Sequence, residues 1–109
     1  MEVSDGLYRM PKMLTPGEVC LRVYGNLKQL PVLLEENPDC TWQYDDVVVC
    51  PNKKGRTGEP IKGDTVTSFI KRVYPGQPPH EYVQGYLQWN AHMLPDELVG
   101  ETLFIPAIR

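Results

Sequence analysis

Residues 62–74 read KGDTVTSFIKRVY, which predicts a tight turn followed by a short amphipathic helix. Thr65 or Thr67 can cap the start of this helix with its hydroxyl group. The apolar side chains recur at the spacing of one helical face, and they are Phe69, Ile70 and Val73. Tyr-Pro-Gly at 74–76 is then expected to end the helix, because proline and glycine do not continue it.

The same order of features occurs earlier in the chain. Arg22-Val23-Tyr24 repeats Arg72-Val73-Tyr74 at an offset of 50 residues. Before it, Thr15-Pro16-Gly17-Glu18 combines a capping threonine, a proline suited to the first helical position and a glutamate at the capping-box position. Gly25 suits the left-handed residue that ends many helices. An internal repeat of this length indicates two copies of one supersecondary unit.

Each copy continues with a second helix and contains two strands. The predicted second helices cover 27–36 and 80–89 and stop at Asn37 and Asn90. The predicted strands are 7–10 and 46–50 in the first copy, and a stretch near 60–62 and 102–105 in the second. The order in each copy is therefore strand, helix, helix, strand.

We expect an α+β protein made of two tandem βααβ units. The first unit covers 1–52 and includes an N-terminal arm, and the second covers 61–109. Residues 53–60 are polar and punctuated by glycine and proline, which predicts a linker. Because units this small bury little apolar surface alone, we expect them to pack into one body.

The second copy resembles the LysM module. The resemblance rests on Gly63-Asp64-Thr65, on Trp89-Asn90 and on the ending LPDELVGETLFIP at 94–106. The first copy matches less well, because Met13-Leu14-Thr15 stands in place of the Gly-Asp-Thr start. Its stretch CLRVYG at 20–25 is also similar to the LysM-like tail protein X family of phages with contractile tails. The resemblance implies that two helices pack on one face of a two-stranded antiparallel sheet in each unit.

LysM modules bind chains of N-acetylglucosamine in a shallow groove between two loops, so the resemblance implies candidate glycan-binding residues in the second copy. They are Gly63, Asp64 and Thr65 on one side, and His92, Met93 and Leu94 on the other. The alternative is that Gly63, Asp64 and Thr65 form only the turn and the helix cap that the fold requires. A fold needs such residues whether or not a sugar binds.

Loop and arm residues are the candidates for contacts with other proteins. Trp42 and Tyr44 fall in a predicted loop, where aromatic side chains often mark a contact surface. Leu7 and Tyr8 lie in the apolar N-terminal arm. For Trp42, packing between the two units is an equal alternative.

Composition argues against several other functions. The net charge of −3 argues against nucleic-acid binding, and the basic run Lys53-Lys54-Gly55-Arg56 is expected to be a solvated part of the linker. The first residues, 1–6, do not resemble a signal peptide, and no apolar run is long enough for membrane insertion. Three cysteines, an odd number, favour a reducing cytoplasm over a disulfide framework.

We expect neither a catalytic site, a cofactor nor a metal. The three cysteines and the two histidines lack the close pairing that zinc sites show, and they are Cys20, Cys40, Cys50, His80 and His92. Cys20 and Cys50 fall on predicted core faces, where a thiol acts as a small apolar group. Adjacent carboxylates such as Glu35 and Glu36 point in different directions on a helix and cannot act on one substrate together.

Two functions are consistent with these features. The first is a structural component of a phage tail or baseplate, or of a related contractile injection system, that is made in the host cytoplasm and resides in the virion. It would act as an assembly adaptor between the tail tube or hub and surrounding proteins, in several copies arranged as a ring. The alternative is a LysM protein that binds peptidoglycan or chitin.

Overall fold

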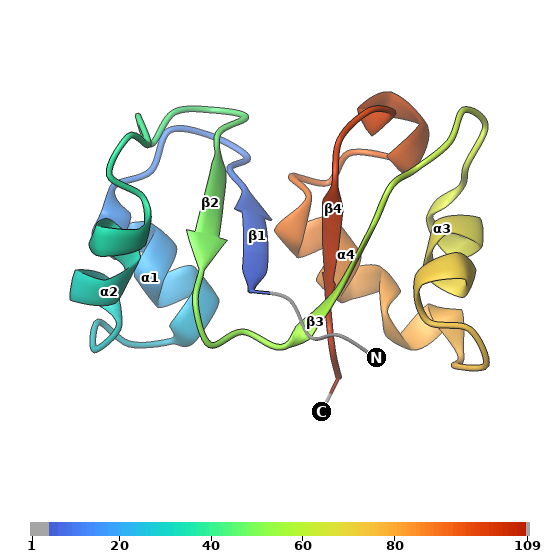
Figure 1. Cartoon of the computed structure of the whole chain (residues 1–109), viewed down its shortest axis with the longest axis horizontal. Coiled ribbons are helices and arrows are strands. Elements are labelled where there is room, and N and C mark those ends of the chain that lie inside the picture. The colour runs from blue at the N-terminus through green and yellow to red at the C-terminus, as the bar shows by residue number, and fades with distance from the viewer. Residues whose placement is uncertain (1–4, 109) are drawn as a thin grey trace.

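Each half of the chain begins and ends with a short strand, and the two strands of a half pair with each other (Figure 1). The computed structural model describes residues 5–108, so 1–4 and 109, the outer ends of the two expected units, lie outside it. The first half contains β1 (Gly6–Arg9), α1 (Pro16–Tyr24), α2 (Leu30–Glu36) and β2 (Val47–Cys50). The second half contains β3 (Gly55–Gly58), α3 (Val66–Val73), α4 (Val83–Trp89), β4 (Leu103–Pro106) and the 3₁₀ turns η1 (Pro79–Glu81) and η2 (Pro95–Leu98).

Both strand pairs are antiparallel. In Figure 1, α1 and α2 lie at one edge of the molecule and α3 at the other, whereas α4 packs on β4 and also contacts β1. β1 pairs with β2 so that Tyr8 lies opposite Val48, and β3 pairs with β4 so that Thr57 lies opposite Phe104. The α+β class that the sequence predicts is therefore confirmed. No helix in residues 5–108 has the length and apolar character needed to cross a membrane.

A threonine caps the first helix of each half. The Thr15 hydroxyl accepts the Glu18 N–H at 3.2 Å, and the Glu18 carboxylate accepts the Thr15 N–H at 2.9 Å. Thr65 and Ser68 form the same reciprocal pair at 3.0 Å and 2.9 Å. Thr65, rather than Thr67, is therefore the cap of α3. The first helix ends as the sequence predicts, because Gly25 takes the left-handed conformation with φ 78°.

The linker predicted over 53–60 contains a strand. β3 lies at Gly55–Gly58, upstream of the strand predicted near 60–62, so both of those predictions are wrong in this detail. The sequence does not reveal this strand because glycines stand where strands usually carry apolar side chains. A Cβ on Gly55 would lie 2.5 Å from the Phe104 ring, and a Cβ on Gly58 would lie 2.7 Å from Val73. The neighbouring apolar side chains occupy the space next to this strand, and the strand itself shows no apolar alternation.

A buried asparagine joins the end of the second helix to the closing strand in each half. The Asn37 amide donates to the carbonyl oxygens of Leu33 and Val49, both at 2.8 Å, and its oxygen accepts the Val49 N–H at 2.8 Å. The Asn90 amide donates to the carbonyl oxygens of Tyr86 at 2.9 Å and Phe104 at 3.0 Å. These are the two asparagines that the sequence places at the ends of the second helices.

A tyrosine at the end of the first helix makes a second repeated tether. The Tyr24 hydroxyl donates to the Pro51 carbonyl oxygen, just after β2. The Tyr74 hydroxyl donates to the Ile105 carbonyl oxygen of β4 at 2.7 Å. Both helices of a half are therefore attached to its closing strand by side-chain hydrogen bonds to the backbone.

The two halves share part of their core. Trp89 and Phe104 belong to the second half, but they are buried in the cluster of apolar side chains that the first half forms. The Trp89 ring packs edge-on against Tyr8 with centroids 5.7 Å apart, and it lies 4.9 Å from the Phe104 ring. The radius of gyration is 13.5 Å, close to the value of about 13 Å expected for a single compact domain of this length. The two halves therefore form one compact body.

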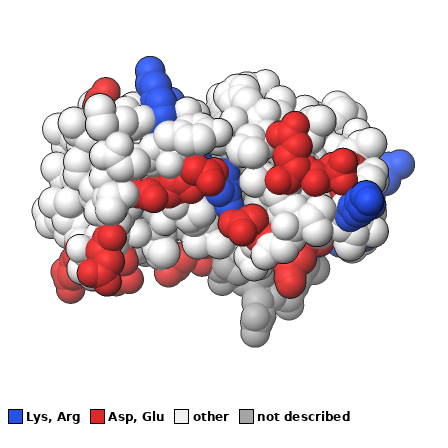
Figure 2. Space-filling model, turned by 90° about the horizontal axis from the view of Figure 1, so that it is seen from above, with Lys and Arg blue, Asp and Glu red and all other residues white. Residues whose placement is uncertain are grey.

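An ion-pair bridge crosses the junction between the halves. Only 6% of the Arg9 side chain is exposed, and its guanidinium binds Asp45 of the first half at 2.8 Å and Glu101 of the second at 2.7 Å. Seen from above, acidic side chains prevail at this end of the molecule (Figure 2). The buried cation therefore links two acidic loops that would otherwise repel each other.

Replacing Asn90 with alanine is expected to lower the free energy of unfolding by about 2 kcal/mol, because it leaves the buried Phe104 carbonyl without its donor. Urea unfolding followed by tryptophan fluorescence measures the loss. Gln88→Ala, an exposed position on the same helix, is the control and should change stability by less than about 0.5 kcal/mol. Equal losses in the two variants would contradict the role of the asparagine.

Candidate functional site

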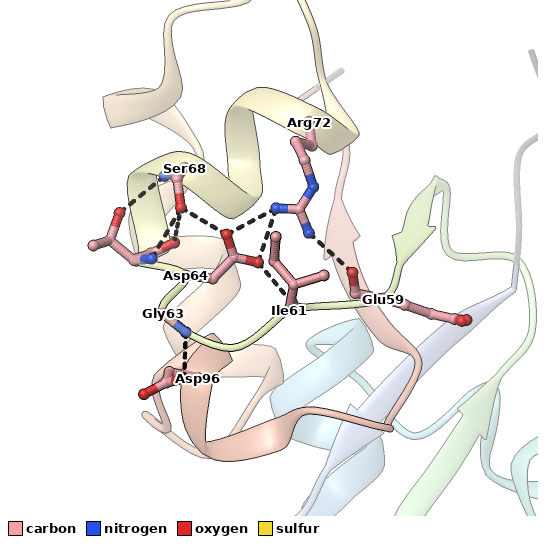
Figure 3. A network of polar contacts seen from close by, with 8 residues as sticks. Glu59, Ile61, Gly63, Asp64, Ser68, Arg72 and Asp96 are labelled. Atoms are coloured by element: carbon pink, nitrogen blue, oxygen red, sulfur yellow. Dashed lines mark hydrogen bonds and ion pairs between the residues drawn. The ribbon is translucent and has the colours of Figure 1, made fainter.

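The predicted glycan-binding residue Gly63 lies in the loop before α3 and is hydrogen-bonded to the loop after α4 (Figure 3). Gly63 has a φ of 87°, a conformation that suits glycine. Its N–H donates to the Asp96 carboxylate of η2 at 2.6 Å. The two loops that would border a LysM groove are thus tied directly to each other.

Asp64 is engaged in a network within the protein (Figure 3). Only 5% of its side chain is exposed. The carboxylate accepts the Ile61 N–H at 2.9 Å, the Ser68 hydroxyl at 2.8 Å, and Arg72 at 2.8 Å to each oxygen. Arg72 also donates to the Glu59 carbonyl oxygen at 2.9 Å. Asp64 therefore fixes the entry loop onto α3, which is the structural role that the sequence left open.

The pKa of Asp64 reflects this network. Burial by itself would raise the pKa, but the hydrogen bonds from Ile61, Arg72 and Ser68 outweigh that effect and hold it below its usual value. The carboxylate is therefore ionised at neutral pH and already occupied by protein donors. Thr65, the third residue of the motif, is exposed and uses its hydroxyl oxygen to cap α3.

The three residues predicted for the other side of the groove lie in different surroundings. His92 is exposed, has a φ of 60°, and lines a hollow of about 320 Å³ at the junction of the halves, beside Trp89 and Arg22. Met93 packs against the second apolar cluster, and its carbonyl oxygen accepts the Tyr86 hydroxyl at 2.8 Å. Leu94 is 49% exposed. Of the three, Leu94 is the residue that offers an exposed apolar side chain.

The first half has a hollow between the corresponding two loops. It measures about 290 Å³ and is lined by side chains that include Met13, Pro16, Trp42 and Gln43. Trp42 has a φ of 59°, an uncommon conformation for a bulky residue, and its carbonyl oxygen accepts the Leu14 N–H at 3.4 Å. The half-buried Trp42 side chain packs against the first apolar cluster and forms one wall of the hollow.

Asp46 holds the loop that carries Trp42. Its carboxylate accepts the Thr41 hydroxyl, the Thr41 N–H at 3.1 Å and the Gln43 N–H at 3.2 Å. The bond from the Thr41 hydroxyl is the largest of the effects that lower the pKa of Asp46. The sequence gives no sign of this role, because Asp46 reads as the first residue of a strand.

The remaining contact candidates differ in how accessible they are. Tyr44 is 61% exposed, and Leu7 is half-buried. Tyr8 is only 4% exposed, so its assignment to a contact surface is wrong. It packs against Trp89 and belongs to the core that joins the halves.

Cys40 and Cys50 lie in environments that disfavour the thiolate. Burial raises the pKa of Cys50 to about 12, and burial also raises the pKa of Cys40. Cys20 is buried and donates to the Asn26 carbonyl oxygen at 3.2 Å. Within residues 5–108, no group of three histidine, cysteine or acidic side chains is placed to hold a metal ion.

Comparisons with family models, with curated proteins and with solved structures give no match to this chain. The likeness to LysM modules and to tail protein X therefore rests on the sequence motifs alone. Any function has to be argued from those motifs together with the geometry described above.

Changing Asp64 to asparagine is expected to lower the free energy of unfolding by about 2 kcal/mol at pH 7, because the charge-assisted bonds to Arg72 are weakened. The pKa of Asp64 is depressed in the folded state. Its contribution is therefore complete above the unfolded pKa of about 4 and is lost as the pH falls through the lower folded value. Urea unfolding at pH 7 and at pH 3 measures the difference, which should shrink in acid.

Asp39→Asn is the matched control, because Asp39 is an exposed carboxylate. It should leave stability nearly unchanged at both pH values. An Asp64→Asn deficit that is as large at pH 3 as at pH 7 would mean that the carboxylate charge is not what stabilises the loop.

Proposed function

We propose that the two halves are copies of one LysM-like βααβ unit that are fused into a single non-catalytic body. The support is the repetition of three interactions at corresponding places. The capping threonines Thr15 and Thr65, and the tethering tyrosines Tyr24 and Tyr74, stand 50 residues apart. The asparagine tethers occupy the same position at the end of each second helix.

We propose that this body is an assembly adaptor in a phage tail or baseplate, or in a related contractile injection system. The observation that carries the proposal is the rigid junction. Tyr8 and Trp89 interlock the two units and Arg9 binds an acid from each, so the outer faces keep a fixed relative orientation. A connector between two other proteins needs that property.

The surface of the first half suits contacts with other proteins. Large apolar side chains are exposed on and between its helices, and they are Leu21, Leu27, Val32 and Leu34. Exposed apolar groups of this size favour burial in an interface. Other tail or baseplate proteins, and further copies of this chain arranged in a ring, are the proposed partners. The proposed location is the virion.

Glycan binding is the second candidate, and one observation favours it. The hollow beside Trp42 combines an aromatic wall with the polar groups of Thr15, Glu18 and Gln43. Aromatic rings and short polar side chains suit the two faces of a sugar. This site lies in the first unit, whereas the motif residues point to the second, where Asp64 is already bound by Arg72.

Tyr44→Ala is expected to reduce incorporation into tail-like particles while leaving the protein folded, because Tyr44 is largely exposed. An aromatic side chain at an interface commonly contributes about 2 kcal/mol, enough to lower occupancy clearly. Particles purified from the native host, carrying tagged wild-type or variant chain, would be compared by quantitative immunoblot and electron microscopy. Lys71→Ala, at an exposed position on α3 in the second half, should be incorporated normally. Absence of the wild-type chain from any such particle would reject the adaptor function.

Glycan-binding measurements on the wild type and on Trp42→Ala distinguish the two functions. Under the adaptor proposal, wild-type protein does not bind chitohexaose or peptidoglycan sacculi in calorimetry and pull-down experiments. If glycan binding is the function, the wild type binds, and Trp42→Ala weakens binding at least about tenfold because one stacking face is lost. Thr67→Ala, on the exposed side of α3, is the control and should bind like the wild type.

A further inference from the structure

β3 begins beside the end of β4, near the C-terminal end of the chain (Figure 1). A hollow of about 500 Å³ is lined by residues from these two places. Its centre is a stack of three planar groups. The Arg56 guanidinium lies 4.6 Å from the Tyr74 ring centroid, and the Tyr74 ring stacks on Tyr82 with centroids 4.3 Å apart. We refer to this hollow as the Arg56 pocket.

The guanidinium of Arg56 is oriented before any ligand arrives. One of its N–H groups donates to the Val73 carbonyl oxygen at 3.1 Å, and the Tyr74 ring beneath it is anchored to Ile105. Among residues 5–108, no acceptor takes its remaining N–H groups. A guanidinium fixed on an aromatic face with free donors is well prepared to bind an oxyanion.

The pocket has the opposite charge to the protein as a whole. Lys54 stands two residues before Arg56, so both side chains leave the same face of the extended chain. Among the described residues that line the pocket, Glu81 is the only acid. Two cations against one acid leave a net positive charge, although the chain carries −3 overall. The pocket also lies at the other end of the strands from the acidic loops seen in Figure 2.

The remaining residues that line the pocket indicate what kind of group would lie next to a bound oxyanion. Ile108, which is 50% exposed, and the edge of Tyr82 supply apolar surface, and Gln77 supplies an amide that can pair with a peptide group. The single Glu81 carboxylate disfavours a multiply charged phosphate more than a singly charged carboxylate. Together these walls fit an acidic side chain that is followed or preceded by an apolar one.

We propose that the Arg56 pocket binds an acidic segment of a partner protein, with a carboxylate on Arg56 and Lys54 and an apolar side chain on Ile108. This inference names a partner chemistry and a site that the adaptor proposal does not. It does not require that the partner belong to a phage tail. The basic run that reads as a solvated linker in the sequence thereby acquires a binding role.

The proposal is tested by titrating N-acetyl-Ile-Glu-amide into ¹⁵N-labelled protein and following the amide signals. We expect saturable shifts at Gly55, Arg56 and Gln77 with a Kd of about 1 mM, as suits a short fragment. The matched probe N-acetyl-Ile-Gln-amide, which lacks the charge, should bind at least about tenfold more weakly. Equal binding of the two probes would overturn the proposal, and so would tighter binding of inorganic phosphate at the same signals.

Three variants locate the site. Arg56→Gln should weaken binding of the acidic probe about tenfold and Lys54→Gln about threefold, because each loses one charge that faces the ligand. Lys53→Gln is the control, since Lys53 lies over Tyr24 rather than in the pocket and should change binding less than about twofold. Lys54 is exposed, so its variant keeps the test valid if Arg56→Gln does not fold. Equal weakening by Lys53→Gln and Lys54→Gln would show general charge attraction and would overturn the pocket.

Discussion

The hydrogen bonds of two buried asparagine amides hold the architecture together. A two-stranded sheet is marginally stable alone, and helices of seven residues such as α2 and α4 do not persist in water without tertiary contacts. Asn37 and Asn90 join these two weak elements, because each amide binds its own helix end and the backbone of the closing strand. The loops that start at these asparagines are positioned by the same bonds. Those loops carry Trp42 in one half and Leu94 in the other, so the candidate contact residues depend on the tethers.

Much of the local structure follows from the sequence, but the way the halves meet does not. The caps at Thr15 and Gly25 and the two asparagine stops are local signals, and the structure bears them out. β3 escapes prediction because its glycines make room for Phe104 and Val73, which are distant in the sequence. Tyr8 reads as a surface residue for a similar reason, since its partner Trp89 lies in the other half. Periodicity along one segment carries no information about such long-range contacts.

In the candidate site, too, the sequence shows the local motif but not its long-range contacts. Gly-Asp-Thr is recognisable in the sequence, but its role depends on Arg72, which stands a helix length away and takes both carboxylate oxygens of Asp64. In the first half Leu14 occupies the corresponding position and is 3% exposed. An ion pair in one half and an apolar side chain in the other thus fill equivalent places. Arg22 repeats Arg72 in the sequence yet is left exposed, because the acid it would need is absent at position 14.

The shared core has a consequence for how the chain is made. The first half emerges from the ribosome before Trp89 and Phe104, so its apolar cluster is incomplete until they have been translated. Tyr8 therefore lacks its aromatic partner Trp89 until the second half has been made. The first half alone would lack part of its interior, so the two halves cannot be separated without exposing apolar side chains.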